Sequence, residues 1–133
     1  MNDWIVWFRE LGMNDVSRVG GKNASLGEMI SNLANAGIKV PDGFATTAAA
    51  YHAFVENGGL GERINGILNN LDVDNVSQLQ VTGAKIRSMV MDHPLPADLE
   101  KAIRSGYDKL GGSVAVRSSA TALGKAFVRL WIY

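Results

Sequence analysis

The sequence predicts a mixed α and β fold in which helices are in the majority and strands are few. Three observations support this fold class. Apolar residues recur at helical spacing in five segments between residues 22 and 110. Short aromatic or β-branched runs, typical of strands, lie before, between and after these segments. Paired glycines at residues 20–21, 58–59 and 111–112 separate elements, because glycine adopts backbone angles that other residues resist.

The first expected element is a buried strand at residues 4–8, an aromatic and β-branched run. After a turn-like break, a helix is expected to begin between Lys22 and Ser25. Ser25 and Glu28 have the spacing of a capping box, and Gly37 is expected to end the helix. The apolar stripe of this helix comprises Leu26, Met29, Ile30 and Leu33.

A turn at residues 41–43 leads into a short extended segment at residues 44–47. Thr46 or Thr47 is expected to cap a second helix, which ends at the glycine pair 58–59. The apolar face of this helix carries Ala48, Tyr51, Phe54 and Val55.

Three further helices are expected between residue 60 and the glycine pair 111–112. Pro94 stops the second of them, and Pro96 suits the first turn of the third. Their inward residues are expected to be Leu60, Ile64, Ile67, Leu68 and Leu71, then Val76, Leu79, Ile86 and Val90, then Leu99, Ala102, Ile103, Tyr107 and Leu110. Beyond the glycines, residues 113–116 are expected to form a central strand that leads into Arg117.

Composition excludes several classes of function. Basic and acidic residues number 13 each, so the balanced charge gives no indication of nucleic-acid binding. The chain has no cysteine, which excludes disulfides and thiolate sites and fits a cytoplasmic location. No signal peptide is recognisable, and no apolar run approaches the roughly 20 residues that span a bilayer. We therefore expect neither nucleic acid nor membrane as a partner.

Two polar segments are candidates for chemistry. In the first, Gly20 and Gly21 lead directly into a helix with Lys22 in its first turn. Free backbone N–H groups and the helix dipole favour an anion there, and the lysine adds a mobile charge that suits phosphate. The segment is not a Walker A loop, because Val16 and Asn23 stand where that motif requires other residues. Its alternative interpretation is a surface loop with a solvated lysine.

The second segment is residues 114–121, with Arg117 at the carboxyl end of the expected strand. A planar guanidinium matches phosphate oxygens in two-point contact, and Ser118, Ser119 and Thr121 can donate further hydrogen bonds. The alternative is an arginine that pairs with a nearby carboxylate. His52 and His93 have no partner at metal-ligand spacing, and we identify neither a catalytic residue nor a metal ligand in the chain.

Three motifs in register resemble the opening of the phosphoenolpyruvate synthases, also called pyruvate, water dikinases. They are residues 11–29, which include the Asn-Ala-Ser-Leu-Gly-Glu-Met run, residues 40–47 and residues 114–122. The resemblance covers roughly residues 4–122 in the correct order. Related dikinases and antibiotic phosphotransferases share the general pattern. The amino-acid sequence of the first motif favours the synthase branch.

This resemblance implies part of an ATP-grasp-like nucleotide-binding domain in residues 1–122. It also implies ATP and Mg²⁺ as cofactors, and Lys22 and Arg117 as the residues that hold the ATP phosphates, with support from Gly20, Gly21 and the hydroxyl groups after the arginine. The whole enzyme converts ATP, pyruvate and water into phosphoenolpyruvate, AMP and phosphate, a reaction of gluconeogenesis. It uses a phosphohistidine on a swivelling domain and a barrel that binds pyruvate.

Residues 123–133 depart from the family pattern, which continues with an acidic stretch and a Gly-Gln segment. The magnesium ligands, the phosphohistidine and the pyruvate site belong to parts that these 133 residues do not match. We therefore expect the isolated chain to be inactive, and we expect the apolar tail to cover an exposed sheet edge or to mediate self-association. Two alternatives stay open, namely a non-catalytic nucleotide-binding or interaction module and a fragment of a pyruvate, phosphate dikinase.

Overall fold

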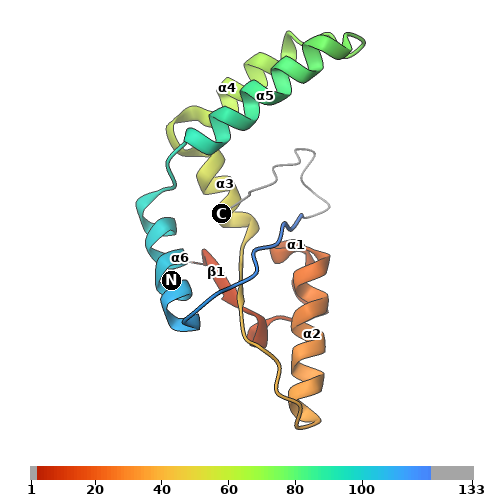
Figure 1. Ribbon diagram of the computed structural model, residues 1–133, viewed down its shortest axis with the longest axis vertical. Helices are drawn as coiled ribbons and strands as arrows, with labels where there is room; N and C mark the ends of the chain where they lie inside the picture. Colours follow the sequence, from red (N-terminus) through yellow and green to blue (C-terminus); the bar gives the residue numbers. More distant parts are fainter. Residues whose placement is uncertain (1–2, 121–133) are drawn as a thin grey trace. The chain divides into compact units, whose positions relative to one another are not determined.

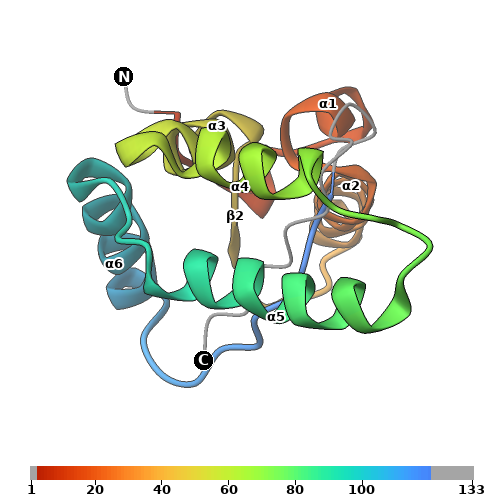
Figure 2. The same ribbon diagram turned by 90° about the horizontal axis from the view of Figure 1, so that it is seen from above.

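The computed structural model describes residues 3–120, which divide into two compact units (Figures 1 and 2). The first unit contains residues 3–51 and 98–120, and the second contains His52–Ala97. The first unit is therefore assembled from two stretches of chain that the second separates in sequence. The fold is rich in helices and has one two-stranded sheet, which agrees with the predicted fold class.

The sheet of the first unit pairs β1 (Ile5–Trp7) with β2 (Phe44–Thr46) in antiparallel register. Val6 lies opposite Ala45, and both side chains are buried while their neighbours along each strand are more exposed. The alternation of a half-buried strand explains why only the middle residue of each strand enters the core. Both strands were predicted, although β1 is shorter than residues 4–8.

Beside the sheet, two single 3₁₀ turns, η1 (Phe8–Glu10) and η2 (Met13–Asp15), lead into α1 (Val16–Val19) and α2 (Gly21–Asn35). The core of this unit comprises Val6, Leu11, Val19, Ala24 and Ala45, with Phe8 and Val16 packed against it.

The long helix α2 packs closely on the turns before it. A Cβ atom on Gly27 would lie 2.5 Å from the Leu11 Cβ and 2.6 Å from the Leu11 carbonyl oxygen. Ala24 is fully buried, whereas Met29, expected inside, is 47% exposed. The buried face of α2 therefore consists of Ala24, Gly27 and Ile30. The predicted stripe was right at Ile30 and wrong at Met29, because the close approach moves the contact face toward the small residues.

The capping box predicted for Ser25 and Glu28 was also wrong. The helix begins at Gly21 with Gly20 as its N-cap, so Ser25 and Glu28 lie inside it. Both side chains instead contact Met13. The Glu28 carboxylate accepts a hydrogen bond from the Met13 N–H at 3.2 Å, and the Ser25 hydroxyl lies 3.6 Å from the methionine sulfur. These residues fasten α2 to η2 rather than start the helix.

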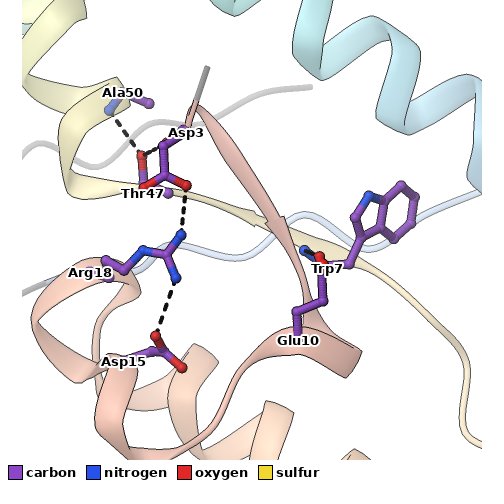
Figure 3. A network of polar contacts seen from close by, with 7 residues as sticks. All are labelled: Asp3, Trp7, Glu10, Asp15, Arg18, Thr47 and Ala50. Atoms are coloured by element: carbon purple, nitrogen blue, oxygen red, sulfur yellow. Dashed lines mark hydrogen bonds and ion pairs between the residues drawn. The ribbon is translucent and has the colours of Figure 1, made fainter. Parts of the chain in front are cut away.

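Thr47 caps α3 (Ala48–Glu56), as one of the two predicted candidates. Its hydroxyl accepts a hydrogen bond from the Ala50 N–H at 3.2 Å and donates to the Asp3 carbonyl at 2.5 Å (Figure 3). Arg18 of α1 bridges the carboxylates of Asp3, at 2.6 Å, and Asp15, at 3.2 Å. The hydrogen bond to Asp3, aided by Asp15, raises the pKa of Arg18. This network joins the start of the chain to α1 and to the start of α3.

In the second unit, η3 (Asn57–Gly59) leads into α4 (Leu60–Asn69), which lies beside α5 (Val76–Asp92) as a helical hairpin (Figures 1 and 2). Asn75 caps α5 by accepting a hydrogen bond from the Gln78 N–H. The only residues of this unit that are buried are Phe54 and Leu60. Val76 and Leu79, predicted to face inward, are exposed because a two-helix hairpin covers only one narrow stripe of each helix.

The last helix, α6 (Ala97–Leu110), returns to the first unit and buries Leu99 and Gly106. Gly106 lies against Phe44 and Ile5, where a Cβ atom would come within 3.0 Å of both side chains. Tyr107 is 48% exposed, so its predicted inward position was wrong. It lies one residue past the glycine that makes the contact.

The predicted strand at residues 113–116 is not formed. The segment after Gly111 and Gly112 has no regular structure, and both of its valines are exposed. A strand exists only with a hydrogen-bonded neighbour, and within residues 3–120 the sheet contains β1 and β2 alone. Residues 121–133, which include Thr121 and the apolar tail, lie outside the described residues, as does the predicted domain boundary at residue 122.

Candidate phosphate-binding site

Gly20 joins α1 to α2 in a conformation that glycine adopts at little cost. Its φ of +85° lies in the region that disfavours L side chains. Its N–H donates to the Val16 carbonyl at 2.8 Å, which ends α1, and its carbonyl accepts from the Ala24 N–H at 3.1 Å, which starts α2. One residue therefore ends the first helix and begins the second, and it fixes the direction of the second helix.

The amino terminus of α2 has the features expected of an anion site. No side chain caps it, and the first N–H groups of a helix have no acceptor within the helix. The Asn23 amide, a residue type that often caps helices, donates instead to the Val19 carbonyl at 2.8 Å. Gly21 and Lys22 are exposed, and a Cβ atom at Gly21 would meet nothing within 4 Å. A ligand can therefore approach these N–H groups beside the Lys22 ammonium.

Arg117 lies in the exposed segment that follows α6. The ion pairs among residues 3–120 involve Arg9, Arg18 and Arg104, and neither Lys22 nor Arg117 pairs with a carboxylate of this part. The alternative of an arginine already neutralised by a neighbour therefore has no support in the described structure. Both candidate cations keep their donors available for an anionic ligand.

The two candidate segments meet although about a hundred residues separate them in sequence. Gly20 is buried, and the atom nearest to a Cβ built on it would be the Ala120 carbonyl oxygen, at a distance too short for a real side chain. Figures 1 and 2 show this segment, in blue, passing beside the start of α2. The contact places the chain that carries Arg117, Ser118 and Ser119 next to the Gly20–Lys22 turn.

Among the described residues, the other candidate side chains do not form a set of metal ligands. Within the part of the chain that the structure describes, no three His, Cys, Asp or Glu residues are close enough to hold a metal ion. The described residues therefore form no cluster of protein ligands for the magnesium ion that the resemblance implies. His93 lies in the second unit, edge-on to the Phe54 ring with 5.3 Å between centroids. No described helix is long and apolar enough to cross a membrane.

Comparison with known proteins decides the family. Residues 16–127 match the family model described as pyruvate phosphate dikinase, AMP/ATP-binding domain. The chain belongs to this family. The match includes both segments of the candidate site, and it extends five residues into the tail that was expected to diverge.

Individual members of the dikinase AMP/ATP-binding family are similar over most of the chain. The phosphoenolpyruvate synthase of Escherichia coli strain K12 is 52% identical over 123 residues, 89% of this chain. The synthase of Neisseria meningitidis serogroup B is 52% identical over 91% of the chain, and that of Pseudomonas aeruginosa is 54% identical over 92%. The chain spans 16% of the length of each of these relatives and corresponds to their amino-terminal part.

Proposed function

We propose that this chain is the ATP-binding amino-terminal part of a phosphoenolpyruvate synthase. Such an enzyme converts ATP, pyruvate and water into AMP, phosphoenolpyruvate and phosphate through a phosphohistidine. Membership of the dikinase AMP/ATP-binding family supports nucleotide binding. The names of the relatives, at 52–54% identity, favour the synthase over a pyruvate, phosphate dikinase. The ATP-grasp-like fold, the role in gluconeogenesis and the cytoplasmic location belong to the same proposal.

In this proposal Lys22 and Arg117 hold the phosphates of ATP. The observation that carries it is the contact between Gly20 and Ala120, which joins the two segments. The uncapped N–H groups of α2 and the unpaired guanidinium would then approach one anion from two sides. Gly20 and Gly21 let the backbone approach the phosphates, and Ser118, Ser119 and Thr121 supply hydroxyl donors. The role of these cations is to position and neutralise the transferring phosphoryl groups.

A calorimetric comparison tests these roles. We expect Lys22→Ala and Arg117→Ala each to weaken ATP binding by about 1.5–3 kcal/mol, the range for a hydrogen bond to a charged group. The exposed residues Lys39 and Arg87, which carry the same charges outside the site, provide the matched controls Lys39→Ala and Arg87→Ala. AMP should be affected less than ATP if the cations contact the outer phosphates. Equal ATP affinity in all variants would show that the phosphates bind elsewhere.

A second expectation concerns the reaction. A polypeptide limited to these 133 residues should form no phosphoenolpyruvate from ATP and pyruvate, because it matches 16% of the synthases and contains neither the phosphohistidine motif nor the pyruvate site that the resemblance implies. A coupled assay for phosphoenolpyruvate measures this directly. Product that depends on both ATP and pyruvate, from pure chain, would contradict the assignment of the remaining steps to other parts of the enzyme.

A further inference from the structure

A hollow of about 480 Å³ lies within the first unit, and none of the residues that line it belongs to the Gly20–Lys22 turn. Its walls come from the end of β1 and η1, the loop before β2, the last turn of α6 and the segment after it. The lining residues include Trp7, Arg9, Asp42, Lys109, Leu110 and Val114. The volume falls in the range of small-molecule sites, and the walls combine cations with apolar groups.

Arg9 contacts Trp7 and Asp42 at this hollow, and its side chain is 68% exposed. Its guanidinium carbon lies 5.4 Å from the centroid of the Trp7 ring, and its Nη1 lies 3.4 Å from one carboxylate oxygen of Asp42. The other oxygen of Asp42 accepts a hydrogen bond from the Gly43 N–H at 2.8 Å. A guanidinium has five N–H donors and only one contacts Asp42, at a long distance, so Arg9 keeps donors for a ligand.

Lys109 adds a second positive charge that no described carboxylate neutralises. It lies in the last turn of α6, where the helix dipole favours a cation. The charged groups that line the hollow are therefore two cations and one carboxylate, and the carboxylate is already bonded at both oxygens. The excess of charge at this hollow is positive.

Apart from Ser113, the remaining residues that line the hollow are apolar. Trp7 and Leu110 are half-buried, and Val114 is 43% exposed because the predicted strand is not formed. An indole face and two aliphatic side chains suit the carbon part of a ligand but not a strongly hydrated inorganic ion. The Ser113 hydroxyl, which also lines the hollow, can orient a polar substituent.

We propose that this hollow binds a small organic anion, with its carboxylate or phosphate between Arg9 and Lys109. The apolar body of the ligand lies against Trp7, Leu110 and Val114. None of the residues that line the hollow is among the proposed phosphate-binding residues, although Val114 begins the segment that carries Arg117. We treat the hollow as a second ligand site on the same unit. Carboxylates and phosphate monoesters can both bind to the same two cations, and the following experiment distinguishes between them.

The test is a titration of the 133-residue chain with three probes of one shape: benzoate, phenyl phosphate and neutral benzamide. The indole N–H resonance of Trp7, assigned with Trp7→Phe, reports binding by its chemical shift. We expect the two anions to shift it and benzamide not to do so at the same concentration. The anion with the higher affinity identifies the class of natural ligand.

Lys109→Met should weaken binding of the anions about tenfold, as expected for one charge-assisted contact. Lys101→Met, an exposed lysine of the same helix outside the hollow, and Lys22→Ala should leave it unchanged. The amide spectrum of each variant confirms its fold. The proposal is overturned if benzamide binds as well as the anions, if no probe binds at millimolar concentration, if Lys101→Met has the effect of Lys109→Met, or if Lys22→Ala abolishes binding.

Discussion

Two features of the structure require a glycine at residue 20. The backbone has a φ of +85°, and the Ala120 carbonyl occupies the space that a Cβ atom would need. The sequence predicted the first requirement, because paired glycines before a helix indicate unusual backbone angles. It could not predict the second, since Ala120 has no distinctive chemistry and lies about a hundred residues away.

Replacing Gly20 by alanine should therefore destabilise the chain by more than about 1 kcal/mol, since alanine at positive φ is strained even without the added clash. Gly21→Ala is the matched control, because its Cβ would meet nothing within 4 Å and its φ is ordinary. Urea unfolding followed by circular dichroism measures both. If Gly20→Ala unfolds at the same urea concentration as Gly21→Ala, the close approach of residue 120 does not contribute to stability.

At the scale of the element, apolar spacing predicted the helices well and the strands less well. A helix satisfies its own backbone, so a pattern such as that of Leu99 and Ile103 is sufficient to identify α6. A strand needs a partner, and residues 113–116 have strand-forming side chains but no partner among the described residues. The start of α2 was placed too late because Ser25 and Glu28 imitate a capping box while they bind Met13.

The contact between α2 and Leu11 gives a second stability prediction. Gly27→Ala should cost about 1–3 kcal/mol, the usual penalty for overpacking, because the new Cβ would lie 2.5 Å from the Leu11 Cβ. Asn32→Ala on the same helix is exposed and should change stability little. Thermal unfolding of the two variants measures the difference. An unchanged midpoint for Gly27→Ala would mean that α2 shifts freely away from the turn.

At the scale of the whole molecule, the candidate site lies within one unit. The Gly20–Lys22 turn and Arg117 both belong to the first unit, although residues 52–97 intervene in sequence. The sequence predicted the fold class and identified the two segments as candidates, because helical periodicity and phosphate chemistry are local signals. The division into units was not predicted, since it depends on which helices bury residues together and the periodicity of each helix does not encode that.

The two units should differ in local stability. No residue of α5 is buried, whereas α2 buries Ala24, Gly27 and Ile30. Local opening is easiest where few apolar contacts form, so amide hydrogens of α5 should exchange faster than those of α2. Hydrogen exchange followed by NMR measures this, and α6, which buries Leu99 and Gly106, serves as the internal comparison. Slower exchange in α5 than in α2 would show that the second unit has stabilising contacts beyond those described.

The position of Gly106 against Ile5 and Phe44 has a consequence for the order in which the chain folds during its synthesis. The residues of the core cluster all lie between Val6 and Ala45, so this cluster can form before α6 has been made. The last residue of β2 is Thr46, and at 5–20 residues per second residue 106 emerges from the ribosome roughly 3–12 s after it. Throughout that interval, the part of the sheet that Gly106 later covers is open to solvent and to other nascent chains.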